Sequence, residues 1–206
     1  MSQFALPLDW PAEEREDAFI ASSANAEVLR HLGHVGVWPV KATILVGPRK
    51  SGRSLLGRIF AAKTGGRLID DAETQEEEAI FHAWNHAQEA RRPLLIVADE
   101  APPTWRVALP DLASRLAATP IARIREPDDA LILALVERLL ARRGLVLPPE
   151  VARWLASRIE RSYVGVLRAV EILDAEMLAR RHRLTVPLAR RALEEAGVID
   201  GTRKAD

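Results

Sequence analysis

The chain has 206 residues, 48% of them apolar, which suits one compact domain or a domain with a small lid. Its 29 Lys and Arg residues balance its 29 Asp and Glu residues, so no overall positive field favours non-specific binding to nucleic acid or to a membrane. Cysteine is absent, and the sequence contains neither a membrane-length apolar run nor a secretory leader, which predicts a cytoplasmic protein.

The N-terminal residues 3–8 read QFALPL, an apolar peptide in which Pro7 disfavours a helix. The acidic segment 13–17 follows it. Such a peptide either docks on another protein or covers this protein's own core, and its spacing leaves both interpretations open. Further along, Asn25 is expected to cap a helix over residues 26–32.

The stretch Gly47–Ser54 reads GPRKSGRS; it follows the apolar run Ala42–Val46 and opens a helix that extends to about Lys63. A strand, a glycine-rich turn and a helix form the context of a phosphate-binding P-loop, in which backbone N–H groups and the helix N-terminus face the phosphates. Arg53 stands where the pattern has lysine, so we expect a nucleotide binder that hydrolyses ATP slowly by itself. The alternative is a plain glycine turn. The expected nucleotide-binding residues are Gly47, Pro48, Arg49, Lys50, Ser51, Gly52, Arg53, Ser54 and Leu55.

Three more apolar runs, at residues 67–71, 94–98 and 121–124, alternate with helical patterns and predict a parallel α/β sheet of four or five strands. The carboxyl ends of such strands face the ligand crevice. We therefore expect Asp70 to hold Mg²⁺ through water, together with the Ser54 hydroxyl.

Two other carboxylates at strand ends allow alternatives. Asp71 is a candidate for polarising a water molecule, but adjacent strand residues point to opposite faces, so it could instead cap the next helix. Asp99 could orient water or simply begin the turn before Pro102. After Pro127 the pattern becomes entirely helical. The expected helices are Asp128–Arg143, Pro149–Arg161, Tyr163–Arg181 and Val186–Ala196.

Together these motifs resemble the AAA+ proteins, and among them the Hda family, which is related to the replication initiator DnaA. The run LIDDAETQEEEAIFHAWN resembles the Walker B strand and its helix, and LLIVADEAPP resembles the sensor 1 strand. QFALPL resembles the QLxLPL clamp-binding peptide of Hda, whose P-loop often carries arginine as Arg53 does here. Residues 108–116, ALPDLASRL, resemble the Hda segment with an arginine finger.

The resemblance implies three parts: a clamp-binding peptide and linker (1–17), an AAA+ P-loop domain (18–126) and a helical lid (127–206). It implies ADP or ATP with Mg²⁺ as cofactors, and the sliding clamp (the β subunit of DNA polymerase III) and DnaA as partners. The function it implies is to promote hydrolysis of DnaA-bound ATP. No helix-turn-helix follows the lid, so sequence-specific DNA binding is not expected; homo-oligomer formation stays open. The clamp-binding residues would be Gln3, Phe4, Leu6, Pro7 and Leu8.

Two arginines receive roles from the same resemblance. Arg115 would be the finger, acting on the partner's nucleotide; the alternative is an ion pair with Asp111, four residues earlier. Arg168 would replace a sensor 2 arginine, because Gly165 occupies the usual position; the alternative is an ordinary surface residue. Two other functions also stay open: an adaptor that needs no nucleotide, and an autonomous AAA+ ATPase such as a helicase-loading factor.

Overall fold

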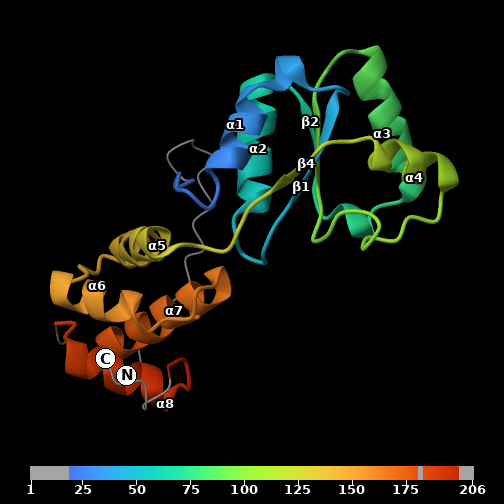
Figure 1. Cartoon of the computed structure of the whole chain (residues 1–206). Helices are drawn as coiled ribbons and strands as arrows, with labels where there is room; N and C mark the ends of the chain where they lie inside the picture. The colour runs from blue at the N-terminus through green and yellow to red at the C-terminus, as the bar shows by residue number, and fades with distance from the viewer. Residues whose placement is uncertain (1–18, 181–182, 200–206) are drawn as a thin grey trace, which may run out of the picture.

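The computed structural model describes residues 19–180 and 183–199, which form an α/β core followed by a group of helices (Figure 1). The expected clamp-binding residues Gln3, Phe4, Leu6, Pro7 and Leu8 lie outside the described residues. Within the described ranges, no helix is both long and apolar enough to cross a lipid bilayer. The same ranges contain no group of three or more His, Cys, Asp and Glu side chains arranged to hold a metal ion.

The core is built on a sheet of four parallel strands in the order β2–β3–β1–β4. All residues of β1 and β3 are buried, as is usual for inner strands of a parallel sheet that is covered on both faces. The predicted parallel sheet of four or five strands is thus confirmed, with four strands among the described residues. The strands are β1 (Ala42–Val46), β2 (Arg67–Ile69), β3 (Leu94–Val97) and β4 (Ile121–Arg123).

The edge strand β2 is shorter than the sequence pattern predicts. It ends at Ile69 because Asp71 adopts a left-handed backbone conformation, with φ of 49°, and leads into the 3-10 turn η3 (Ala72–Thr74). On its other side, Gly65 has φ of 64° and ends the preceding helix, and only Gly66 then separates the helix from the strand. No further strand can therefore form between them.

Helices cover the sheet on both faces (Figure 1). On one face, α1 and α2 pack their apolar side chains against Leu45 and Leu95. On the other face, α3 and α4 pack against Ile44 and Ile96. Alternate residues of the same two strands therefore serve two separate cores. The helices are α1 (Ala26–Gly33), α2 (Arg53–Thr64), α3 (Glu77–Glu89) and α4 (Pro110–Ala117), with the 3-10 turn η2 (Val35–Val37) after α1.

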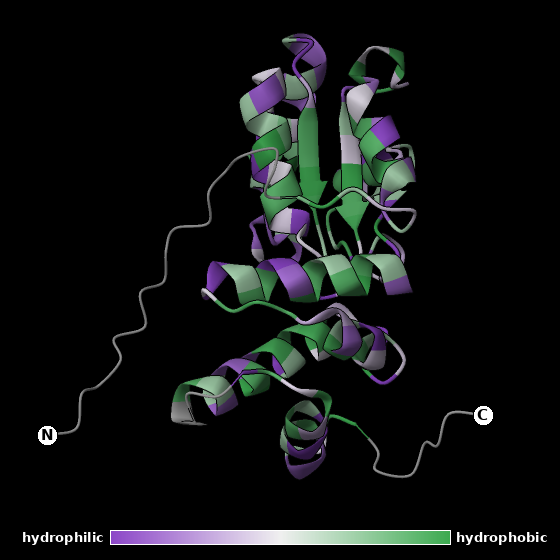
Figure 2. Cartoon of the chain, turned by 90° about the vertical axis from the view of Figure 1, so that its left-hand side faces the viewer, coloured by the Kyte–Doolittle hydropathy of each residue, from purple (hydrophilic) through white to green (hydrophobic). Residues whose placement is uncertain are grey.

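The lid consists of four helices around an apolar core of its own. The strands point their carboxyl ends toward it (Figure 2). Leu131 and Tyr163 of the lid also belong to the cluster between the sheet and α1 and α2, so the lid packs directly on the P-loop side of the core. The helices are α5 (Asp129–Arg142), α6 (Pro149–Ala156), α7 (Tyr163–Arg180) and α8 (Val186–Glu195).

Asn25 occupies the predicted N-cap position of α1, but its side chain does not cap the helix. The side chain is buried and folds back on the preceding loop, where its Oδ1 accepts from the Ser22 N–H at 2.9 Å and its Nδ2 donates to the Ile20 carbonyl at 2.8 Å. Asn25 therefore fixes the loop that leads from Phe19 into the core.

Candidate functional site

The predicted P-loop connects the end of β1 at Val46 to the start of α2 at Arg53. It turns through left-handed conformations at Lys50 (φ 64°) and Gly52 (φ 87°), and only the second is free of strain because it lacks a Cβ. Gly47 lies so close to Ile124, the residue that follows β4, that a Cβ on Gly47 would lie 2.8 Å from the Cβ of Ile124. The loop geometry thus requires glycine at both positions, and a plain glycine turn would meet the same requirement.

The loop has the features of a phosphate cradle. The helix that follows it presents its first N–H groups, and with them the positive end of the helix dipole, to the carboxyl edge of the sheet. The Ser51 hydroxyl is buried and has no hydrogen-bond partner among the described residues. A buried polar atom without a partner is costly, so this hydroxyl fits a ligand that supplies one.

Two oxygen groups suited to Mg²⁺ meet beside the loop. The Ser54 hydroxyl, in the first turn of α2, donates to Oδ1 of Asp70 at 3.1 Å, just beyond the end of β2. A hydroxyl and a carboxylate are ligands that Mg²⁺ accepts, usually with several waters. Ser54 and Asp70 are therefore the residues that would hold the ion.

Asp71 is exposed and begins η3. Its carboxylate makes no capping hydrogen bond; the Asp71 carbonyl accepts from the N–H of Thr74 at 2.9 Å and from its hydroxyl at 2.8 Å. The Asp71 side chain therefore does not cap a helix. That Asp71 polarises a water molecule stays a prediction.

Arg53 points along the carboxyl edge of the sheet. Its guanidinium donates to the Ala98 carbonyl and to the Asp99 carboxylate, both at the end of β3. Its side chain is only 11% exposed. The arginine at the lysine position is thus bonded to this chain's own oxygens, a pairing that local sequence patterns do not reveal.

A cavity of about 180 Å³ lies between the P-loop and the lid. Phe19 packs at its edge against Gly52, where a Cβ would lie 3.2 Å from the ring. Sequence reasoning missed most of this lining. Arg138 and Arg142 are four residues apart and therefore lie on one face of α5. This spacing is the sequence feature that could have indicated that α5 lines the cavity. The residues that line the cavity include Phe19, Ile20, Lys50, Ser51, Gly52, Leu55, Arg138, Arg142 and Tyr163.

Arg168 does not line this cavity. It is exposed, and its Nη2 donates to the Ala196 carbonyl at 2.9 Å, at the C-terminal end of α8. This contact stabilises the lid by capping a helix. The arrangement matches the alternative of a surface residue.

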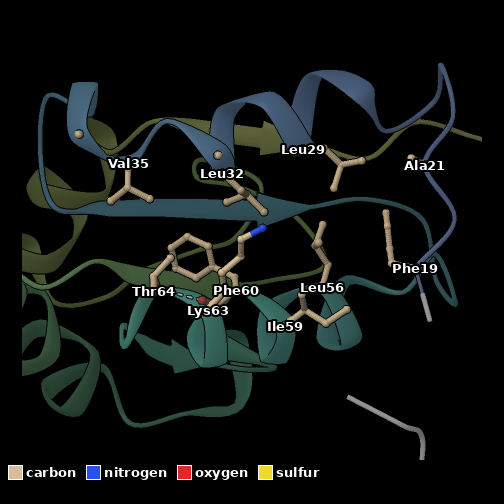
Figure 3. Close-up of a pocket in the computed structure, with 12 residues that line it drawn as sticks. Phe19, Ala21, Leu29, Leu32, Val35, Leu56, Ile59, Phe60, Lys63 and Thr64 are labelled. Atoms are coloured by element: carbon tan, nitrogen blue, oxygen red, sulfur yellow. Dashed lines mark hydrogen bonds between the residues drawn. The ribbon is translucent and has the colours of Figure 1, made fainter. Parts of the chain in front are cut away.

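A larger, mostly apolar cavity of about 550 Å³ lies between α1 and α2 (Figure 3). Leu29, Leu32 and Val35 point into it from one side, and Leu56 and Phe60 from the other (Figure 3). Neither Ser54 nor Asp70 lines it. It is therefore distinct from the phosphate cradle, although Phe19 contributes to both cavities.

Arg115 lies on α4, on the opposite face of the sheet from α2 (Figure 1). Its guanidinium carbon lies 4.9 Å from the ring centre of Phe81 and 4.8 Å from that of Trp84, both on α3. Its Nε is buried without a hydrogen-bond partner, and no ion pair to this side chain occurs within the described ranges. The ion pair with Asp111, the alternative interpretation, is not formed.

Asp111 lies in the first turn of α4 and does not cap the helix. The N-cap position is Leu109, and Pro110 is the first helical residue. The Glu77 carboxylate accepts the N–H groups of Ala108 at 2.8 Å and Leu109 at 2.6 Å instead. A carboxylate of α3 therefore orients the helix that carries Arg115.

The helical lid can be compared with known proteins. Residues 128–193 match the family model for the lid domain of Hda. The lid is therefore similar to the lid domain of Hda. This match confirms the resemblance to the Hda family that the sequence motifs predict.

A sequence relative extends the comparison. An uncharacterized protein of Haemophilus influenzae Rd is 30% identical over 118 residues, which are 57% of this chain and 51% of that protein. The chain thus spans about half the length of this curated relative.

Solved structures share the fold. Domain III of the replication initiation protein DnaA from Thermotoga maritima superposes with a TM-score of 0.73 at 15% identity, over 90% of this chain and 97% of that one. A replication initiator DnaA bound to AMPPCP and single-stranded DNA gives a TM-score of 0.63 at 14% identity, over 88% and 67%. The chain therefore shares the fold of these two DnaA structures.

Proposed function

We propose that this protein is a DnaA-related AAA+ regulator of replication initiation. It binds the sliding clamp through residues 1–17 and a nucleotide, ADP rather than ATP, in the P-loop domain (18–126) below the lid (127–206). It acts in the cytoplasm by promoting the hydrolysis of DnaA-bound ATP. The observation that carries this proposal is the Arg115 guanidinium, which has no counterion within the described ranges and lies on a chain with an Hda lid.

The nucleotide part of the proposal is supported by the cradle. The P-loop N–H groups and the start of α2 bind phosphate oxygens, while Ser54 and Asp70 hold Mg²⁺, which would neutralise phosphate charge. The base would lie in the cavity between the P-loop and α5. The DnaA structure with AMPPCP, a nucleotide analogue, supports this use of the fold.

The action on DnaA is assigned to Arg115. A guanidinium is always charged and can bridge two phosphate oxygens as charge develops on the transferred group. The rings of Phe81 and Trp84 hold the cation in place without neutralising it, because a cation–π contact leaves its N–H donors available. Its position on the opposite face from α2 suits action on a neighbouring molecule.

The test measures hydrolysis of DnaA-bound ATP in the presence of clamp loaded on DNA. Arg115→Ala should lower the stimulation by about 10³-fold or to background, because the charge that stabilises the transition state is lost. Arg115→Lys should restore little, since an ammonium cannot bridge two oxygens in the same plane.

The matched control is Asp111→Ala, on the same helix and with no side-chain hydrogen bond or ion pair to Arg115 among the described residues. It should leave stimulation at the wild-type level, and clamp and nucleotide binding should be unchanged in all three variants. Full stimulation by Arg115→Ala would contradict the assignment.

A nucleotide-independent adaptor is the second candidate. The observation that favours it is the engagement of Arg53 by Asp99, which removes the P-loop cation from the cradle. The two candidates differ in one measurement, because an adaptor would bind neither ADP nor ATP.

A further inference from the structure

The P-loop arginine and the end of β3 form a bonded unit. The Arg53 guanidinium uses its planar fork on two oxygens, the Ala98 carbonyl and the Asp99 carboxylate. The Arg53 side chain is 11% exposed, whereas that of Asp99 is 68% exposed. The guanidinium is therefore enclosed, and its partner carboxylate faces solvent at the mouth of the site.

The acceptor side of this unit is itself held in place. The Asp99 N–H donates to Oε1 of Glu73, and the Glu100 N–H donates to the same oxygen at 3.1 Å. Glu73 comes from η3, directly after Asp70 and Asp71. These hydrogen bonds join α2, the end of β3 and η3. They place the carboxylates of Asp99 and Glu73 beside the cradle.

We propose that Asp99 makes the nucleotide site selective for a diphosphate by keeping Arg53 away from a third phosphate. This inference rests on the nucleotide binding proposed above and deepens it by naming the residue that sets the preference. It predicts that the cradle binds ATP less tightly than ADP although position 53 carries a positive residue.

The physical reason is a difference in what each ligand requires. Backbone N–H groups and the helix dipole of α2 can hold a diphosphate without any guanidinium. A third phosphate adds negative charge near the Asp99 carboxylate, and it gains Arg53 only if the contact with Asp99 breaks. Only the binding of a triphosphate therefore includes the free-energy cost of breaking the contact between Arg53 and Asp99.

The experiment measures dissociation constants of the full chain for ADP and for AMPPCP, a triphosphate that is not hydrolysed, both with Mg²⁺. Wild type should favour ADP. Asp99→Asn, an exposed and nearly isosteric change, should tighten AMPPCP binding about threefold to tenfold, the range for an exposed ion pair with charge-assisted hydrogen bonds. ADP binding should change less than about twofold. Asp99→Ser is a second variant, and a cooperative thermal transition verifies the fold of both.

Glu100→Gln is the matched control, because Glu100 is the adjacent exposed carboxylate and pairs with Arg123 at 3.8 Å rather than with Arg53. It should leave the ratio of the two constants unchanged. An unchanged ratio in Asp99→Asn and Asp99→Ser would overturn the inference but leave nucleotide binding intact. Failure of wild type to bind either ligand would overturn both the inference and the nucleotide part of the proposed function.

Discussion

Tyr163 shows how one side chain joins the lid to the core. It begins α7, is 5% exposed, and its hydroxyl donates to the Arg125 carbonyl at 3.1 Å. Burial, with the nearby charges of Glu126 and Asp128, raises the pKa of the Tyr163 phenol to about 12. The phenol therefore stays neutral and keeps its proton for this hydrogen bond at all ordinary pH values.

Tyr163→Phe should lower the free energy of unfolding by about 0.5–1.5 kcal/mol at pH 8, because it leaves the Arg125 carbonyl without this donor. The folded-state pKa lies above the ordinary value of about 10, so the contribution of the phenol is complete below pH 10 and is lost as the pH rises toward 12. The difference between the free energies of unfolding of wild type and variant, measured in urea, should shrink over that interval. A constant difference would contradict the assigned pKa.

At the scale of elements, the loop that begins at Phe19 lines both cavities, because the Phe19 side chain contributes to each of them. The buried side chain of Asn25 hydrogen-bonds to Ser22 and Ile20, so residues within the described range anchor this loop to the core. The peptide QFALPL precedes it by ten residues. We therefore propose that this peptide binds a partner while the loop stays in place.

Deletion of residues 1–9 should abolish binding to the sliding clamp and leave the cooperative thermal transition within a few degrees of wild type. The reason is that Gln3, Leu6 and Leu8 would dock in an apolar groove of the clamp, with Pro7 reducing the entropy lost on binding. Surface plasmon resonance on immobilised clamp and a melting curve measure the two outcomes. Loss of the transition would instead place the peptide in this protein's own core.

On the scale of the whole molecule, the lid and the α/β core share one apolar cluster through Leu131 and Tyr163. The smaller cavity is bounded by both parts, with Leu55 and Lys50 on one side and Arg138 and Arg142 on the other. A ligand in this cavity would contact core and lid together. Its binding should therefore stabilise the two as one unit.

ADP at 100 times its dissociation constant should raise the free energy of unfolding by about 2.7 kcal/mol and increase the melting temperature of a single transition. Protein purified without added nucleotide and then denatured should release ADP, and the isolated protein should hydrolyse ATP slowly. Absence of a thermal shift with millimolar ADP and ATP would favour the adaptor, and rapid turnover would favour an autonomous ATPase.

The sequence alone determined the backbone framework. β1 ends at the predicted residue, and the P-loop and the four lid helices lie where their patterns predict them, although α6 ends at Ala156 rather than near Arg161. Apolar period, glycine positions and helix-breaking residues act over a few neighbours, so they are visible without a structure. The Hda resemblance also rests on such local motifs.

Only the tertiary structure decided which partner each candidate site side chain has. Arg53 meets Asp99 at a separation of 46 residues, and Arg115 lies against Phe81 and Trp84 rather than beside its helical neighbour Asp111. Arg168 caps α8 and does not reach the cavity. Local sequence limits the backbone, but long side chains choose among partners that packing brings from distant elements, and this choice sets the chemistry of the site.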